Sequence, residues 1–96
     1  MKVVWTPEAA GDLEDVLSYI ATQNPLAAGV FATRIDRTVS FIAQFPGGGR
    51  LDPETGCREW VVRGLPLLIV YHVTAELVEI IALFHTSRDP ASKRRP

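Results

Sequence analysis

Apolar and polar positions divide this chain into a helical first half and a β-rich second half. Between residues 58 and 85, three apolar runs rich in Val, Ile, Tyr, Trp and Phe are separated by Gly64-Leu65-Pro66 and by Ala75-Glu76. Breaks of this length are typical of hairpin connections, and these residue types favour strands. The pattern therefore predicts a three-stranded antiparallel meander with strands at 58–63, 67–74 and 77–85.

The middle strand of this meander is apolar on both faces. Leu68 and Val70 lie on one face, and the opposite face carries an alternating apolar row: Leu67, Ile69, Tyr71 and Val73. The same alternation in the last strand predicts a single apolar row: Val78, Ile80, Ala82 and Phe84. An antiparallel sheet with one solvated face would alternate apolar and polar positions. The second face of the sheet therefore needs cover and is a candidate interface.

Helix-start signals occur twice in the first half of the chain. After a short β-branched and aromatic run at 2–5, Thr6-Pro7 supplies an N-cap and a proline at the first helical position, and Asn24-Pro25 repeats the signal. These positions predict one helix to about Gln23 and a second to about Phe45. Because the junction is so short, the two helices should form an antiparallel hairpin.

Both helices have the apolar spacing of amphipathic helices. The first should bury an apolar stripe and expose an acidic outer face that includes Glu8, Asp12 and Asp15. Phe41 falls outside the apolar stripe of the second helix, so it either packs on the first helix or remains partly exposed for a partner.

The segment from Pro46 to Gly49 stops the second helix and opens a polar loop. No strand precedes these glycines and no Gly-Lys-Ser/Thr helix start follows them, so they do not match a phosphate-binding loop. They are predicted to be a flexible linker. The element order is that of an α+β domain with a helical hairpin on one face of the sheet. Residues 1–88 should form this single domain, and residues 89–96 should be a mobile basic tail.

Composition and charge narrow the class of protein. The formal net charge of -1 is a poor match to a chain that holds nucleic acid by itself. The single cysteine, Cys57, has no partner in the chain, and neither a zinc-binding pattern nor an apolar run of membrane-spanning length is present. The sequence therefore indicates a soluble protein of the cytoplasm that requires no metal or cofactor.

The order of elements, the strand run LLIVYHV and the ending ALFHTSRDP together resemble the RelE/ParE superfamily of toxins from type II toxin-antitoxin systems. The pattern of an apolar strand, His85, two residues and Arg88-Asp is similar to the ParE branch, also called the plasmid-stabilisation family. The resemblance covers nearly the whole chain.

This resemblance implies a growth-arresting toxin that acts on DNA gyrase by binding. It also implies a hetero-oligomeric complex with a ParD-like antitoxin, which carries a ribbon-helix-helix DNA-binding half and a toxin-wrapping half. Two alternatives remain open. The RelE branch cleaves messenger RNA on the ribosome, and a non-toxic domain could use the apolar second face of its sheet to form a homodimer.

Candidate site residues follow from these hypotheses. We expect no catalytic residues in a binding toxin. Its target-binding residues are predicted to be Arg58, Arg63, His85 and Arg88. Its antitoxin-binding residues are predicted to be Phe41, Leu68 and Val70.

A ribonuclease would instead need a base, an acid and cations around one phosphate. Glu59, His85 and Arg58 could supply them if the strand ends converge. Against this alternative, the meander contains no lysine, the tail contains no tyrosine, and the acidic first helix would repel RNA. His85 could equally be a structural histidine, and Arg58 could pair with Glu59 or Glu79.

Overall fold

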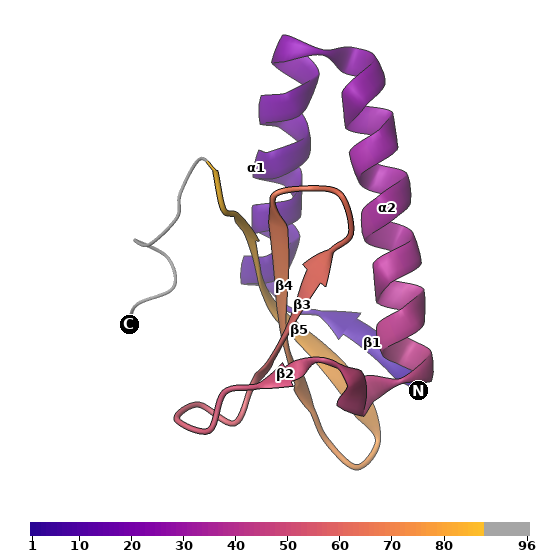
Figure 1. The fold of residues 1–96 in the computed structure, drawn as a ribbon, viewed down its shortest axis with the longest axis vertical. Helices are drawn as coiled ribbons and strands as arrows, with labels where there is room; N and C mark the ends of the chain where they lie inside the picture. Colours follow the sequence, from indigo (N-terminus) through magenta and orange to yellow (C-terminus); the bar gives the residue numbers. More distant parts are fainter. Residues whose placement is uncertain (88–96) are drawn as a thin grey trace.

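The computed structural model describes residues 1–87 of the chain, which form the predicted α+β fold (Figure 1). The elements in chain order are β1 (Lys2–Trp5), α1 (Pro7–Gln23), α2 (Pro25–Gln44), the 3₁₀ turn η1 (Pro46–Gly48), β2 (Arg50–Leu51), β3 (Arg58–Val62), β4 (Leu67–Val73) and β5 (Leu77–His85). The tail predicted for residues 89–96 lies outside the described residues.

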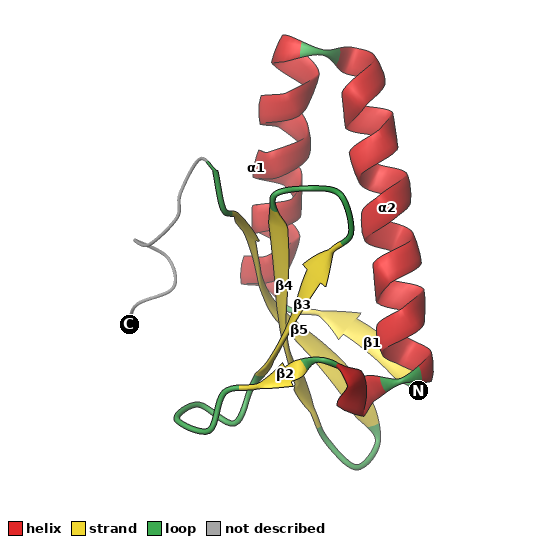
Figure 2. Ribbon diagram, in the orientation of Figure 1, coloured by secondary structure: helices red, strands yellow, loops and turns green. Residues whose placement is uncertain are grey.

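Side-chain caps fix the helical hairpin. The Oγ1 atom of Thr6 accepts a hydrogen bond from the N–H of Ala9 at 3.2 Å, and Oδ1 of Asn24 accepts one from Ala27 at 3.2 Å. Asn24 also ends α1, because its own N–H donates to the carbonyl of Ile20 at 2.8 Å. One residue thus ends one helix and begins the next, which gives the antiparallel hairpin seen in Figure 2.

The sheet contains five strands in the order β1-β5-β4-β3-β2. The predicted meander of β3, β4 and β5 is confirmed, and β1 pairs in parallel with β5. The short strand β2 was not predicted. It lies in the polar loop and pairs antiparallel with the first two residues of β3.

The hydrophobic core lies between the helical hairpin and one face of the sheet. Val16 of α1 and Ile35 and Ile42 of α2 pack there with buried sheet residues: Val62, Leu67, Ile69, Tyr71, Val78, Ile80 and Leu83. The junction end of the hairpin projects past the sheet in Figure 1. That end of each helix therefore has no sheet beneath it.

A β-bulge in β5 overturns the predicted row of Val78, Ile80, Ala82 and Phe84. The register with β4 shifts between Val70 and Tyr71, so that Ala82 pairs with Val70 but Ile80 pairs with Tyr71. Ile81 is the additional residue, and beyond it the alternation is reversed. Leu83 therefore faces the helices, and Phe84 lies on the second face of the sheet, opposite Leu68.

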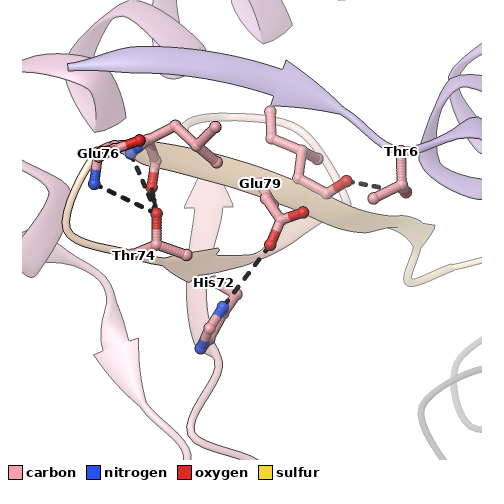
Figure 3. A network of polar contacts seen from close by, with 7 residues as sticks. Thr6, His72, Thr74, Glu76 and Glu79 are labelled. Carbon is pink, nitrogen blue, oxygen red and sulfur yellow. Dashed lines mark hydrogen bonds and ion pairs between the residues drawn. The ribbon is translucent and has the colours of Figure 1, made fainter.

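Threonine hydroxyls fasten the β1 and β4–β5 ends of the sheet, where His72 and Glu79 also lie opposite each other (Figure 3). Thr6 Oγ1 donates to the carbonyl of Ile80 at 3.0 Å, which holds the start of α1 against β5. Thr74 Oγ1 accepts from the N–H of Leu77 at 3.1 Å within the β4–β5 turn. Across these strands, His72 Nδ1 lies 3.8 Å from Glu79 Oε1 on the second face.

Candidate functional site

Two grooves of opposite charge lie on the two sides of β3. The first, the acidic groove, is a cavity of about 410 Å³ on the second face of the sheet. Its apolar floor includes Val70 and Phe84, and four carboxylates line it: Glu8, Asp12, Asp52 and Glu59. Such a concentration of negative charge disfavours the approach of a phosphate group.

Asp12 holds α1 against the edge of β5 beside the acidic groove. Strand β1 ends at Trp5 opposite Ile80, so no strand pairs with that edge of β5 beyond this point. There the Oδ2 atom of Asp12 accepts a hydrogen bond from the N–H of Leu83 at 3.1 Å. The prediction that Asp12 belongs to an outward acidic face was wrong, because the unpaired edge of β5 offers its carboxylate a backbone donor.

The second groove, the arginine groove, lies between α2 and β3 and has a volume of about 530 Å³. Its lining residues are Arg34, Arg37, Thr38, Phe41, Trp60 and Arg63. Within residues 1–87, no acidic residue lines it. Glu59 and Trp60 are neighbours in β3 and point to opposite faces of the sheet, so each lines a different groove.

Phe41 is the most exposed aromatic residue of the arginine groove. Its side chain is 53% exposed, and it also lines a second cavity of about 270 Å³ with Arg37 and Gln44 of the same helix. The sequence left two possibilities for Phe41, packing on the first helix or partial exposure. The structure shows partial exposure.

The glycine segment after α2 is packed against the sheet. The Tyr71 hydroxyl donates to the carbonyl of Pro46 at 2.9 Å and accepts from the N–H of Gly49 at 2.9 Å. A Cβ atom on Gly48 would lie 2.8 Å from the Trp60 ring. The prediction of a flexible linker was wrong, because aromatic side chains of β3 and β4 use the space that the glycines leave.

Arg58 completes this packing beside Tyr71. The Nη1 atom of Arg58 donates to the carbonyls of Gly47 at 3.2 Å and Gly49 at 2.9 Å. Burial raises the pKa of the Tyr71 hydroxyl above its usual value of 10.0, while the hydrogen bond from Gly49 and the charge of Arg58 oppose this rise. The Arg58 side chain is thus engaged within the fold.

The three residues named for the ribonuclease alternative do not converge. Arg58 is directed to the glycine segment, whereas Glu59, on the opposite face of the same strand, lines the acidic groove. His85 lies at the end of β5, where its ring centroid is 6.0 Å from that of Tyr19 in an edge-to-face contact. This arrangement offers no common position for one phosphate.

The predicted binding residues are also distributed over several surfaces. Phe41 and Arg63 share the arginine groove, Val70 lines the acidic groove, and Leu68 is buried with 7% exposure. Arg88 lies outside the described residues. Arg34, Arg37 and Trp60 were not predicted as site residues, although the helical spacing of Arg34, Arg37 and Phe41 is visible in the sequence.

The described part of the chain contains neither a metal-binding cluster nor a helix suited to span a membrane. No cluster of His, Cys, Asp and Glu in residues 1–87 could hold a metal ion. Neither helix in this range is both long enough and apolar enough to cross a membrane.

The chain is similar to toxins of type II toxin-antitoxin systems, and these relatives carry both ParE and RelE names. The family model described as "ParE toxin of type II toxin-antitoxin system, parDE" matches residues 3–90. Toxin RelE2 of Caulobacter vibrioides is 39% identical over 87 residues, which cover 91% of this chain and 97% of that toxin. A solved structure of the chromosomal ParDE toxin-antitoxin system from P. aeruginosa superposes with a TM-score of 0.75 at 22% identity, covering 86% of this chain and 92% of the other.

Proposed function

We propose that this chain, which belongs to the ParE toxin family of type II toxin-antitoxin systems, arrests growth by binding DNA gyrase and is neutralised by a ParD-like antitoxin. Family membership follows from the match over residues 3–90 and from the 39% identity to a named toxin. We propose three further points: that the target is gyrase, that the antitoxin is ParD-like, and that inhibition involves no chemical step.

The separation of Arg58, Glu59 and His85 is the observation that carries this proposal. Cleavage of RNA requires a base, an acid and cations within hydrogen-bond reach of one phosphate. Glu59 instead lines a groove with three other carboxylates, and the Arg58 guanidinium donates to backbone carbonyls. Inhibition through surface contacts requires no such convergence.

Exposed apolar side chains support the antitoxin as a partner. Phe41 is 53% exposed on α2 and Val61 is 64% exposed on the second face, so a covering protein would remove apolar surface from water on both sides of the sheet. We propose a hetero-oligomer in which the antitoxin supplies the DNA-binding half. The net charge of -1 on this chain is consistent with that division of roles.

For gyrase, we propose contacts through Arg63, which is exposed immediately after β3. His85, at the end of β5, and Arg88, which lies outside the described residues, were predicted for the same role. The Arg58 side chain is less available, because it bonds the glycine segment. An antitoxin that covers Arg63 would then neutralise the toxin by occupying part of its target-binding surface.

The name of the Caulobacter relative, Toxin RelE2, gives a specific reason to retain a second candidate function. A RelE-type toxin would cleave messenger RNA on the ribosome, and His85 and Glu59 would then be needed for a chemical step.

Expression of the gene in bacterial cells separates these functions. The chain would be induced alone and together with the reading frame adjacent to it, and the 5′ ends of ribosome-bound messenger RNA would be mapped. We expect growth arrest, rescue by the neighbouring product, intact messenger RNA, and continued toxicity of Glu59→Gln and His85→Ala. Circular dichroism of both variants verifies that they fold.

Two results would contradict the proposal. Cleavage within ribosomal complexes that disappears in His85→Ala would assign the chain to the ribonuclease function. Normal growth during induction of a folded chain that elutes as a homodimer would instead support the non-toxic interaction domain.

A further inference from the structure

We infer that the acidic groove is the docking site for the chain's own basic C-terminal segment, residues 88–96, whose cations face the carboxylates that line the groove. The contact is made within one chain. The inference therefore goes beyond the proposed function and rests neither on gyrase as the target nor on an antitoxin.

The acidic groove is preformed, because backbone hydrogen bonds fix a carboxylate on each of its two sides. On the α1 side, Oδ2 of Asp12 accepts from the N–H of Leu83 at 3.1 Å. On the side of the β2–β3 connection, Oδ1 of Asp52 accepts from the N–H of Glu54 at 3.0 Å, and the N–H of Asp52 donates to the carbonyl of Cys57 at 2.8 Å. An occupant thus meets carboxylates that are already ordered, which reduces the entropy lost on docking.

The lining of the groove favours lysine and arginine side chains. Its floor includes Val70 and Phe84, and the aliphatic stems of lysine and arginine pack on apolar surface while their charged ends reach polar groups. Four carboxylates line the groove, whereas neither lysine nor arginine of residues 1–87 does. A basic segment is therefore the occupant that uses both the floor and the charge.

The C-terminal segment has the complementary composition. Residues 88–96 contain one acid, Asp89, and four cations: Arg88, Lys93, Arg94 and Arg95. Taking these from the 10 cations and 11 acids of the whole chain leaves six cations and ten acids in residues 1–87. The described domain is thus acidic and the segment that follows it is basic, so the two attract each other.

The segment begins beside the groove. Strand β5 supplies Ile81, Ala82 and Phe84 to the lining and ends at His85. Arg88 follows three residues later, so the chain places it within about 10 Å of His85. Lys93 follows after five more residues and can lie up to roughly 25 Å from His85. The segment is therefore long enough to cross the groove to its far side.

The covalent connection favours this occupant over a separate basic peptide. Exposed ion pairs are individually weak, but a short linker gives the attached segment an effective concentration on the order of millimolar. Any other basic occupant must displace it. If Arg88 also contacts gyrase, the groove and gyrase compete for this side chain.

A nitroxide spin label on the segment tests the docking in the full chain. Ser92→Cys provides the attachment site, and Cys57→Ser removes the other cysteine. Broadening of backbone amide signals by the label is measured at Asp52 and Thr55, which line the groove in the β2–β3 connection. Strands β4 and β3 separate this connection from β5, so the start of the segment does not by itself bring the label there.

Neutral variants of the groove give the decisive comparison. Glu8→Gln with Glu59→Gln removes two groove carboxylates, and Glu14→Gln with Asp15→Asn removes the same charge from exposed positions of α1 outside the groove. We expect the broadening at Asp52 and Thr55 to fall about twofold or more in the groove variant and to persist in the control. It should also fall at 1 M salt, where the screening length is only about 3 Å. Circular dichroism verifies that each variant folds.

Charge reversal provides a second measurement. Replacing Lys93, Arg94 and Arg95 by glutamate should abolish the broadening in the otherwise unaltered chain. Combining this acidic segment with Glu8→Lys and Glu59→Lys should restore it, because both sides of the contact then carry the opposite charge.

Three results would overturn the inference. The first is equal broadening at Asp52 and Thr55 in the groove variant, the control and the otherwise unaltered chain, and the second is broadening that does not depend on salt. The third is broadening that arises only between chains, seen when isotope-labelled chain without nitroxide is mixed with nitroxide-labelled chain, since this would assign the groove to the segment of a second copy. None of these results depends on gyrase or an antitoxin, so the proposed function is tested separately.

Discussion

The hydroxyl of Tyr71 accepts a hydrogen bond from the backbone N–H of Gly49 at 2.9 Å, which joins the centre of the sheet to the segment that follows α2. The same hydroxyl donates to the carbonyl of Pro46 at 2.9 Å. One buried side chain therefore satisfies two backbone groups of a segment that has no regular partner strand. Arg58 supports the same segment from β3.

Tyr71→Phe should destabilise the fold without changing its shape. The substitution leaves the N–H of Gly49 and the carbonyl of Pro46 without their partner, and an unsatisfied buried group costs about 1–3 kcal/mol. Urea unfolding measures the change. Thr33→Ala, which alters an exposed hydroxyl on α2, is the control and should change stability by less than about 0.5 kcal/mol. Equal stability of Tyr71→Phe and the unaltered chain would show that these hydrogen bonds contribute nothing.

Alkaline pH should weaken the unaltered chain more than Tyr71→Phe. Burial raises the pKa of Tyr71 in the folded state above 10.0, so the folded chain holds this proton more tightly than the unfolded chain does. The resulting stabilisation is present below pH 10.0 and is lost as the pH rises through the folded-state pKa. The difference in unfolding free energy between the two proteins should shrink as the pH rises through the folded-state pKa. A difference that stays constant with pH would contradict the prediction.

Gly64→Ala should destabilise the chain by more than about 1 kcal/mol. Gly64 has a φ of +77°, and a Cβ atom there would collide with Nη1 of Arg34. Gly29→Ala is the matched control, because a Cβ on this exposed helical glycine meets nothing within 4 Å. It should stabilise the chain by roughly 0.5–1 kcal/mol. Thermal unfolding of both variants measures the contrast, and a neutral Gly64→Ala would refute the prediction.

Asp12→Ala should loosen α1 from the edge of β5. The variant loses the acceptor for the N–H of Leu83, and because water can partly replace it, the cost should be about 1–2 kcal/mol. Asp12→Asn keeps an oxygen acceptor and should retain more of the stability, while Asp15→Ala on the exposed side of α1 should be neutral. Hydrogen exchange of the Leu83 amide measures the contact directly. Unchanged protection in Asp12→Ala would contradict this role.

The local elements of the fold could be predicted because their determinants are local. Thr6 and Asn24 begin helices through contacts with residues three positions ahead, and the short breaks after β3 and β4 leave no alternative to hairpins. The bulge at Ile81 could not be predicted, because Ile81, Ala82 and Leu83 are all apolar and only the pairing with β4 fixes their faces. The packing of Gly48 and Gly49 was missed for a related reason, since it depends on Trp60 and Tyr71 from distant strands.

The candidate site was less predictable than the fold. Phe41 and Arg63 were both identified from the sequence, but in different roles, and only the approach of α2 to β3 places them in one groove. Glu59 and Arg58 were proposed for one catalytic site with His85 on the condition that the strand ends converge. Strand alternation instead directs their side chains to opposite faces.

Supercoiling of relaxed plasmid DNA by purified gyrase, titrated with the refolded chain, tests the central claim most directly. We predict inhibition that increases with the concentration of the chain, is relieved by the antitoxin, and persists in Glu59→Gln and His85→Ala. Undiminished supercoiling at saturating amounts of folded chain, under conditions in which the same preparation cleaves ribosome-bound messenger RNA, would contradict the account.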